Sequence, residues 1–449
     1  MSSAVEPEVI VIGGGVAGLS AATSLAGRGK RVLLLERRQH LGGRTYSFTD
    51  ETTGDTVDNG QHVMMGCYTE TLSYLNRVGS RPLTSLQPSL RIPFADIATG
   101  RSTVLKAGSL PAPLHIFSGL LGLSSLSLAD KFMLARVGTE LLRTNPTKES
   151  ALDDVTVEQW LTALGQSERA RRHLWDVIAI GTLNDHPGTV SALPFYRVLR
   201  AAFFGRRSNA SLLIPHAGLS DILVHPARTY LEQRGSNILT GTAVDALMRS
   251  TTGITGLTLH SGETVTAPCV ILAVPQYAAV DLLPDKETAR PIGELDSSPI
   301  ITINLWFDRQ VMVEPFVALL NGRVQWAFNR TMLTGSSQPG QYLSCVISGA
   351  RYHVEQEKRA LISQAIEDLA AVFPAVAVAN LTHTLVIKEV RATFTPRPGS
   401  EALRPKTETT FSNLFLAGDW TDTGIPATIE GAILSGHRAA DAAFRYLER

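Results

Sequence analysis

This 449-residue chain is short of charge of either sign. Charged residues make up 18% of it, and 41 basic and 41 acidic side chains cancel to a formal charge of zero. A protein that binds nucleic acid through the phosphates normally carries a basic excess, so we expect no nucleic-acid partner. A disordered chain is poor in apolar residues, whereas 44% of these residues are hydrophobic. We therefore expect a large folded protein with extensive apolar surface to bury.

Cysteine is also scarce. Cys67, Cys269 and Cys345 are scattered, and no two of them form a C-x-x-C pair. This pattern excludes a disulfide framework and disfavours a structural zinc site, so we expect no metal. It is typical of a protein from a reducing cytoplasm, which is the localisation we expect.

Long apolar runs are missing as well. The first eight residues include two acids and no Lys or Arg, which disfavours a signal peptide. The longest apolar segment, 116–129, is broken by glycine and serine and is shorter than the roughly 20 residues of a spanning helix. Segments 114–128 and 200–207 are candidates for contact with the inner face of the cytoplasmic membrane, since the second sets two phenylalanines between arginines. Burial of both as helices is the alternative.

What the chain does contain is a glycine motif near its start. The β-branched run 8–12 predicts a buried strand, and G-x-G-x-x-G follows it, before an Ala- and Leu-rich helix. A second strand, 31–36, ends in Glu36, 18 residues after Gly18. This spacing is typical of dinucleotide binding, with the pyrophosphate at the helix N-terminus and the acid on an unphosphorylated ribose. The expected cofactor residues here are Gly13, Gly15, Val16, Ala17, Gly18 and Glu36.

The residues after Glu36 separate NAD from FAD. Gly42 and Gly43 permit close backbone approach, and Arg37 and Arg44 can meet phosphate. A nicotinamide fold does not need this second glycine pair. Here the chain resembles the flavin amine oxidase and phytoene desaturase superfamily, whose pattern is G-x-G-x-x-G, an acid, and then G-G-R/K. The resemblance implies FAD, held without a covalent bond because no cysteine lies near residues 390–440.

A second segment of the same superfamily lies near the other end of the chain. Residues 414–417 predict a strand that delivers an Ala-Gly-Asp loop, and an Ala-rich helix follows T-I-E-G-A. In the superfamily, this acid bonds the ribityl chain, and the positive end of the helix faces the flavin N1–C2=O edge and stabilises the reduced anion. The resemblance assigns five residues here to FAD: Val244, Gly418, Asp419, Thr428 and Ile429. Val244 is expected to touch the adenine, and Thr428 and Ile429 to act through backbone groups.

The loop D-N-G-Q-H at 58–62 stands where relatives contact the flavin ring, and it adds Gly60, Gln61 and His62 to the expected cofactor residues. With P-A-P-L-H at 111–115, L-I-P-H-A-G-L-S-D at 213–221, V-R-A-T-F at 390–394 and T-G-I-P-A-T-I-E-G-A at 423–432, it resembles the squalene-associated FAD-dependent desaturases, or hydroxysqualene dehydroxylases. The resemblance runs from about residue 8 to 440. It implies reduction of hydroxysqualene, a C30 isoprenoid alcohol, to squalene on a bacterial hopanoid route, with an unidentified electron donor.

That reaction needs a hydride from reduced FAD and an acid that helps the hydroxyl to leave as water. The candidates are His62, by its motif, and His216 and Asp221 in the substrate domain; a structural hydrogen bond is the alternative role for His62. Desaturation of a carotenoid precursor is the alternative reaction, with hydride flowing toward the flavin. Amine oxidation is disfavoured, because Thr428 stands where amine oxidases place an aromatic residue.

These patterns predict an α/β flavoprotein. A Rossmann-like, glutathione-reductase-like FAD-binding domain is expected to be discontinuous, drawn from residues 1–80, 231–290 and 395–449. A helical insertion at 81–230 and a mixed sheet at 291–394 are expected to form the substrate domain, with strands at 300–307 and 342–348 and a helix at 354–373. The low charge then fits a long apolar cavity, with the apolar surplus expected in residues 110–230.

Overall fold

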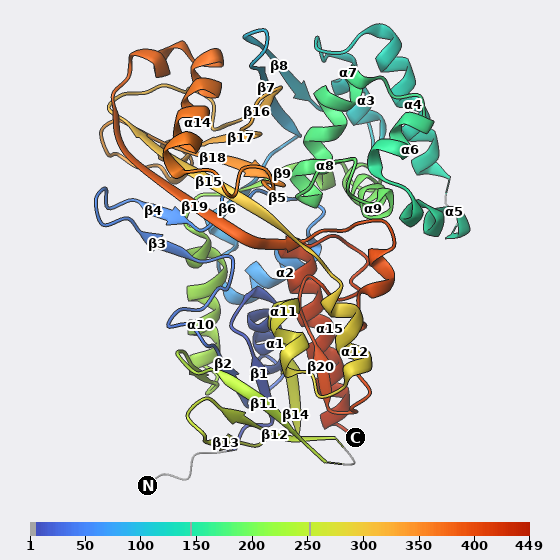
Figure 1. Cartoon of the computed structure of the whole chain (residues 1–449), viewed down its shortest axis with the longest axis vertical. Helices are drawn as coiled ribbons and strands as arrows, with labels where there is room; N and C mark the ends of the chain where they lie inside the picture. Colours follow the sequence, from blue (N-terminus) through green and yellow to red (C-terminus); the bar gives the residue numbers. More distant parts are fainter. Residues whose placement is uncertain (1–5, 144–145, 251–252) are drawn as a thin grey trace.

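The fold was examined in a computed structural model, which describes residues 6–143, 146–250 and 253–449. Figure 1 shows two halves stacked along the long axis of the molecule, with both chain ends in the lower half. The lower half is built on a parallel sheet and the upper half on a larger mixed sheet. This is the predicted α/β architecture, and the chain crosses between the halves several times.

The lower sheet has five parallel strands in the order β10-β2-β1-β14-β20. Every residue of its central strands is buried, as expected for a parallel sheet covered on both faces. Val9 and Val11 face one core and Ile10 and Ile12 the other, so the side chains alternate between two apolar layers. The strands are β1 (Val9–Ile12), β2 (Val32–Leu35), β10 (Asn237–Leu239), β14 (Cys269–Leu272) and β20 (Leu414–Leu416).

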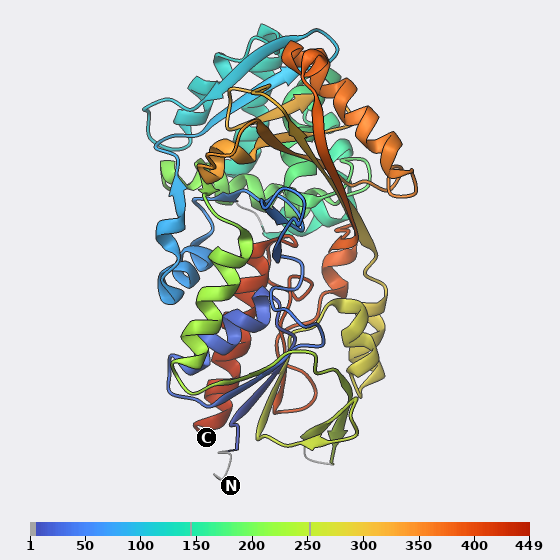
Figure 2. The ribbon, with the colours of Figure 1, turned by 90° about the vertical axis from the view of Figure 1, so that its left-hand side faces the viewer.

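Helices cover one face of this sheet, and a small meander with two short helices covers the other (Figure 2). The first layer holds α1 (Val16–Ala26), α2 (Thr69–Val78), α10 (His225–Glu232) and α15 (Ile429–Leu447). The second holds β11 (Val244–Arg249), β12 (Ile254–Leu259), β13 (Thr264–Val265), α11 (Gln276–Leu282) and α12 (Lys286–Gly293).

The upper sheet has seven strands in the order β19-β15-β18-β17-β16-β7-β8. Its long strands β15 and β19 connect it to the lower half, where β15 follows α12 (Figure 2). The strands are β7 (Arg91–Asp96), β8 (Arg101–Lys106), β15 (Ser297–Phe307), β16 (Phe316–Leu320), β17 (Trp326–Asn329), β18 (Gln341–Ser348) and β19 (Leu381–Phe394). The strands predicted at 300–307 and 342–348 are confirmed.

One face of the upper sheet packs against α14 (Lys358–Val372), which confirms the helix predicted near 354–373. The other face packs against a bundle of helices. The bundle consists of α3 (Leu114–Leu121), α4 (Leu128–Leu142), α5 (Pro146–Ala151), α6 (Val157–Ala163), α7 (Glu168–Ala170), α8 (Asp176–Leu183) and α9 (Ala192–Phe203). In the described parts of the chain, no helix is both long and apolar enough to cross a bilayer.

Residues 81–230, predicted as a helical insertion, contain strands as well as helices. The segment contains β6 (Thr84–Leu86), β7, β8 and β9 (Leu212–Pro215). β7 joins the upper sheet by pairing with β16, more than 200 positions later in the chain. Such pairing is non-local, so the short alternation of 91–106 does not reveal it. Two smaller pairings lie outside these sheets. The strands β3 (Ser47–Thr49) and β4 (Thr56–Asp58) form a hairpin, and β5 (Met64–Met65) pairs with β9.

Candidate functional site

A cavity of about 590 Å³ opens at the carboxyl ends of the parallel strands. The turns after β1, β2, β14 and β20 all contribute to its wall, as in open α/β sheets that bind a ligand at this edge. The upper sheet closes it from above through β15, β18 and β19. Of the predicted cofactor residues, those that line it are Gly13, Gly15, Val16, Ala17, Glu36, Arg37, Gly42, Gly43, Arg44, Gly60, Gln61, His62, Val244, Gly418, Asp419, Thr428 and Ile429.

The glycine motif leaves room for a pyrophosphate. A Cβ built on Gly15 meets no described atom within 4 Å, because the residue faces the open cavity at the N-terminus of α1. Gly13 has φ +107°, and a Cβ there would lie 2.5 Å from the Ala273 carbonyl oxygen. Gly18 stands outside the cavity lining: its Cβ would lie 1.9 Å from the Gly13 oxygen, so its role is the close packing of α1 on β1. The positive helix end and the empty space fit a diphosphate.

Glu36 is held at the cavity wall by two backbone donors. The Gly14 N–H donates to Glu36 Oε2 at 2.7 Å, and the Arg38 N–H donates to Oε1 at 2.9 Å. Each carboxylate oxygen can accept more than one hydrogen bond, so the fixed group retains acceptor capacity for ribose hydroxyls. This geometry fits the predicted adenosine half of FAD.

The second glycine pair joins the two ends of the chain at the site. The Gly42 N–H donates to the Gly14 oxygen at 2.8 Å, and Gly43, at φ +59°, packs its Cα side against Gly15. Arg44 Nη2 then donates to Asp419 Oδ1 at 2.8 Å, and Arg44 Nη1 to the Ala392 oxygen at 2.6 Å. The N-terminal and C-terminal motifs therefore form one wall.

The N-terminus of α15 faces the cavity. Thr428 caps it, with its Oγ1 accepting from the Gly431 N–H at 3.1 Å. Glu430 lies in the first turn, yet its carboxylate turns to α2, where the N–H groups of Glu70 and Thr71 donate to it at 2.9 and 2.8 Å. Burial raises the pKa of Glu430, and these hydrogen bonds oppose the rise. The carboxylate of Glu430 is therefore held by α2 and not by the N-terminus of its own helix.

His62 lies on the cavity wall with a defined tautomer. Its Nδ1 is 2.6 Å from the Gly60 carbonyl oxygen, which can only accept, so Nδ1 carries the proton. Nε2 is left as an acceptor. Burial lowers the pKa of His62, opposed in part by the Gly60 hydrogen bond and the charge of Asp58. The ring is therefore neutral at pH 7, with a basic nitrogen available at the cavity.

A buried ion pair behind this loop was not predicted. Arg330 is 1% exposed; its Nη1 donates to Gln61 Oε1 at 2.9 Å, and its Nη2 lies 3.2 Å from Asp58 Oδ2. Arg330 begins α13 (Arg330–Thr334), some 270 positions after the loop. No motif marks it in the sequence, because the partnership depends on tertiary packing. The pair fixes the loop that presents His62.

The catalytic candidates His216 and Asp221 do not line this cavity. His216 is exposed and contacts Ser85 Oγ at 2.7 Å. Asp221 contacts His225 at 3.1 Å in a π-helical turn. The apolar residues between them enter the core, and this places both polar side chains away from the cavity.

The upper sheet contributes apolar residues to the cavity wall, among them Ile300 of β15 and Val346 of β18. Gly181 and Thr182 of α8 also line it. One turn earlier on α8, Ile178 lines a separate, almost wholly apolar crevice between α3, α4 and α9. One helix thus borders both the cavity and an apolar crevice. The strand pattern of 300–307 and 342–348 predicts burial of these residues, but not which of them reach a cavity.

Comparisons with known proteins agree with this geometry. The family model described as flavin-containing amine oxidoreductase matches residues 16–443. The chain is 30% identical to a hydroxysqualene dehydroxylase of Sinorhizobium fredii, over 97% of this chain and 98% of that protein. It is 27% identical to a zeta-carotene desaturase of Synechocystis, over 97% and 96%. Among solved structures, cyclohexylamine oxidase from Brevibacterium oxydans is similar in fold, with a TM-score of 0.72 and 20% identity over 99% of this chain and 100% of that one.

Proposed function

The chain belongs to the flavin-containing amine oxidoreductase family and is related within it to the hydroxysqualene dehydroxylases, and from this premise we propose that it reduces hydroxysqualene to squalene. It is an FAD-dependent oxidoreductase. The observation that carries the proposal is a cavity whose wall brings together a dinucleotide-binding motif, His62 and apolar residues of the upper sheet. The family relationship supports the reaction, and the cavity supports both the cofactor and an apolar substrate.

The residues on the wall divide the work of holding the cofactor. The N-terminus of α1 would bind the diphosphate, Glu36 the adenosine ribose, and Asp419 the ribityl chain, with Arg44 as its counter-charge. The N-terminus of α15 would offer N–H groups to the flavin ring. When bound and reduced, FAD supplies a hydride.

The bond changes balance with one added proton. The allylic C–O bond breaks, a C–H bond forms with the hydride, and the oxygen leaves as water after taking one proton. Two electrons from a donor of the cell must reload the cofactor for each turnover. His62 lines the cavity, and its Nε2 is the ring nitrogen that Gly60 does not engage, so we assign Nε2 to the hydroxyl: it binds the hydroxyl when neutral and donates the proton when protonated. A lowered pKa makes the protonated ring a stronger acid.

Desaturation of a carotenoid precursor is the second candidate, supported by the similarity to the zeta-carotene desaturase. The same cavity would serve both reactions, which differ in the direction of hydride flow. An experiment with the oxidised holoenzyme distinguishes the two reactions. If mixing it anaerobically with a more saturated isoprenoid leaves the flavin absorbance unchanged, dehydroxylation stands; bleaching of the flavin, with a new double bond in the product, would favour desaturation.

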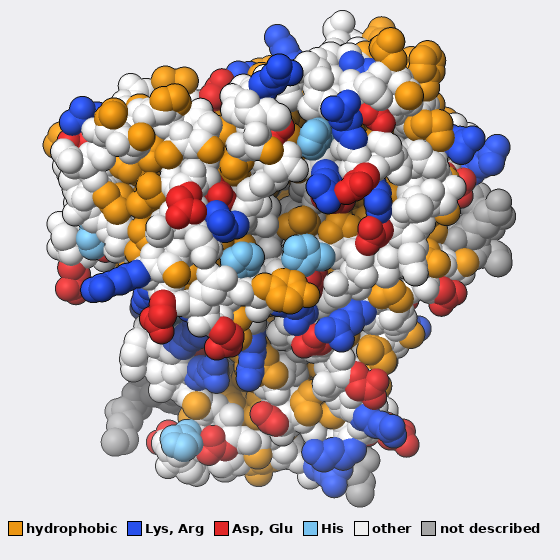
Figure 3. All heavy atoms as spheres, turned by 45° about the horizontal axis from the view of Figure 1, so that its top comes forward, with side chains coloured by type: hydrophobic (Ala, Val, Ile, Leu, Met, Phe, Trp, Pro, Cys, Tyr) orange, Lys and Arg blue, Asp and Glu red, His pale blue; other side chains and the backbone are white. Residues whose placement is uncertain are grey.

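We also propose a cytoplasmic enzyme that works at the membrane surface in bacterial squalene and hopanoid biosynthesis. Apolar side chains project from α3 and α4, among them Leu121, Leu128 and Phe132, the last two 74% and 79% exposed. Figure 3 shows hydrophobic side chains along the upper edge of the molecule. In the second candidate segment, Phe203 and Phe204 line the crevice, while Arg206 and Arg207 beside them are exposed. An apolar patch beside basic residues supports contact with anionic lipid.

A further inference from the structure

The loop between β20 and α15 has no helix or strand of its own, although it carries Asp419 and Thr428 to the cavity. Two of its glycines have positive φ, +151° at Gly418 and +78° at Gly424, so the backbone takes a path that other residues rarely follow. A loop of this kind keeps its shape only if its polar backbone groups find partners.

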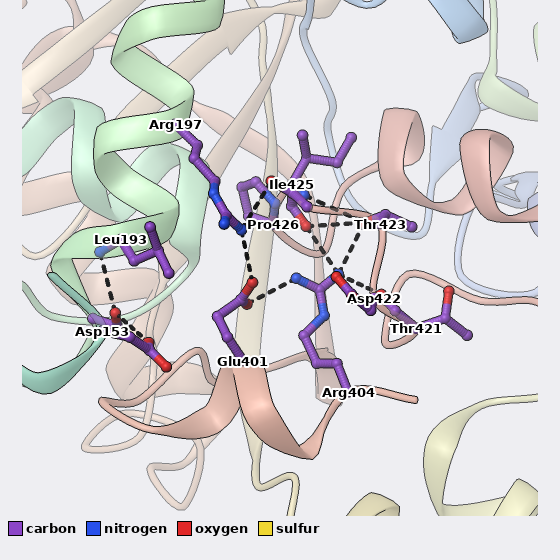
Figure 4. A network of polar contacts seen from close by, with 12 residues as sticks. Asp153, Leu193, Arg197, Glu401, Arg404, Thr421, Asp422, Thr423, Ile425 and Pro426 are labelled. Atoms are coloured by element: carbon purple, nitrogen blue, oxygen red, sulfur yellow. Dashed lines mark hydrogen bonds and ion pairs between the residues drawn. The ribbon is translucent and has the colours of Figure 1, made fainter. Parts of the chain in front are cut away.

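Arg404 provides those partners from beneath the loop, and its side chain is 0% exposed. Its Nη2 lies among four oxygens of the loop, as Figure 4 shows. They are the carbonyl oxygens of Thr421 at 2.5 Å, Ile425 at 3.0 Å and Asp419 at 3.3 Å, and Thr423 Oγ1 at 2.9 Å. One planar guanidinium thus sets the spacing of the loop that ends at Asp419 and at the Thr428 cap.

Glu401 balances this buried charge and extends the network. Its Oε1 accepts from Arg404 Nη1 at 2.8 Å, and its Oε2 from Arg197 Nη1 at 3.1 Å. Arg197 lies on α9 of the helical bundle, and its Nη1 also reaches the Gly424 oxygen at 3.4 Å. The network therefore runs from a helix of the upper half to the cofactor loop of the lower half (Figure 4).

We propose that Arg404 is a positioning residue for the cofactor: it acts through Asp419 and the N-terminus of α15, and Glu401 and Arg197 couple this loop to α9. Removal of the guanidinium takes a charged donor from all three carbonyl oxygens. Those of Thr421 and Ile425 keep a second donor from Thr423, whereas that of Asp419 keeps none among the described residues, so we expect the loop to rearrange. The rearrangement moves Asp419 relative to Arg44 and turns the capped helix end. The flavin then sits in a changed field, although Arg404 itself is not among the residues that line the cavity.

The test compares the holoenzyme with Arg404→Met and Arg404→Lys. We expect the Met variant to bind FAD about tenfold more weakly or worse, with shifted flavin absorption bands and a shifted midpoint potential in dye equilibration. The Lys variant should recover only part of each property, since an ammonium group cannot bridge oxygens as a guanidinium fork does. Arg438→Met is the matched control: Arg438 is exposed and donates to the Asp422 oxygen of the same loop at 2.8 Å, and its loss should leave all three readouts unchanged.

Stability is separated from positioning by measuring Tm in parallel. A Met variant with lower Tm but with wild-type FAD affinity, spectrum and potential would overturn the proposal, because the role would then be structural alone. If Arg404→Met fails to fold, Glu401→Gln and Arg197→Met test the proposal in its place. Both keep Arg404, and we expect each to shift the flavin spectrum and potential in the same direction as Arg404→Lys. Wild-type values in both would overturn the proposal. These readouts concern FAD, so the result is independent of the substrate.

Discussion

Arg44 and Asp419 are 375 positions apart in the sequence and joined by a 2.8 Å charged hydrogen bond at the cavity. The bond ties the G-G-R segment that follows β2 to the Ala-Gly-Asp loop that follows β20. Because Asp419 is buried, each partner depends on the other for its counter-charge. The cofactor site is thus closed by an interaction between the two ends of the chain.

Breaking this pair should weaken FAD binding. We expect Asp419→Asn and Arg44→Met each to raise the Kd for FAD by about tenfold to a hundredfold, since a charged hydrogen bond is worth about 1.5–3 kcal/mol. The double variant should lose less FAD-binding free energy than the two single variants added together, because the two side chains act as a pair. Titration of apoprotein with FAD, followed by fluorescence quenching, gives all four Kd values. Strict additivity would contradict the coupling.

Alanine substitutions at two glycines of the same motif should have different effects, one on FAD binding and the other on stability. Gly15→Ala places a methyl group in open space, so we expect a wild-type Tm for the apoprotein together with severe loss of FAD binding. Gly18→Ala places a methyl group 1.9 Å from the Gly13 oxygen, so the fold itself should lose about 1–3 kcal/mol or more. Thermal unfolding of the apoproteins and FAD titration distinguish them. Equal loss of Tm in both variants would show that Gly15 is a packing glycine.

These glycines also show what the sequence could predict. The cofactor motifs are contiguous, and each position has a local backbone reason, such as the positive φ of Gly13. Arg330 left no such trace, because its partner Asp58 lies far away in the sequence and is brought close only by packing. Arg404 pairs locally with Glu401, but its contacts with the loop oxygens of Thr421 and Ile425 also depend on packing. The sheet strand β7 was not predicted for the same reason, since its pairing with β16 is non-local, and β8 joins the sheet through β7.

His216 and Asp221 show a different limit of prediction from the sequence. Their segment was assigned to the substrate site by its resemblance, but a segment's resemblance does not give the direction of a side chain. The structure directs both outward, and it leaves His62 as the histidine on the cavity wall.

The pH dependence of turnover should follow His62. Burial holds its pKa below 6.5, so the protonated form that donates to the hydroxyl becomes abundant only below that pH. We therefore expect the rate of the chemical step to rise as the pH falls through the range below 6.5, and His62→Gln to lose this limb while retaining FAD. Single-turnover rates from pH 5 to 8 provide the measurement. A rate that is flat or rises with pH, or a Gln variant with the wild-type profile, would assign the proton to another group.

The exposed apolar residues of α4 should control membrane binding. Leu128→Asp combined with Phe132→Asp removes two side chains that can insert into lipid, each worth about 1.5–3 kcal/mol, so partitioning to anionic vesicles should fall at least about tenfold. Val378→Asp is the matched control, because Val378 is 70% exposed but lies outside the bundle. Sedimentation with vesicles at low salt measures the bound fraction. If the unmodified protein stays in the supernatant, this face does not bind the membrane.

The central claim is the direction of hydride flow, and an anaerobic single turnover tests it most directly. The flavin of the holoenzyme is photoreduced, hydroxysqualene is added, and flavin absorbance and extracted products are followed together. We predict re-oxidation of the flavin with one squalene formed for each flavin re-oxidised. A flavin that stays reduced, or one that re-oxidises without squalene, would contradict the account.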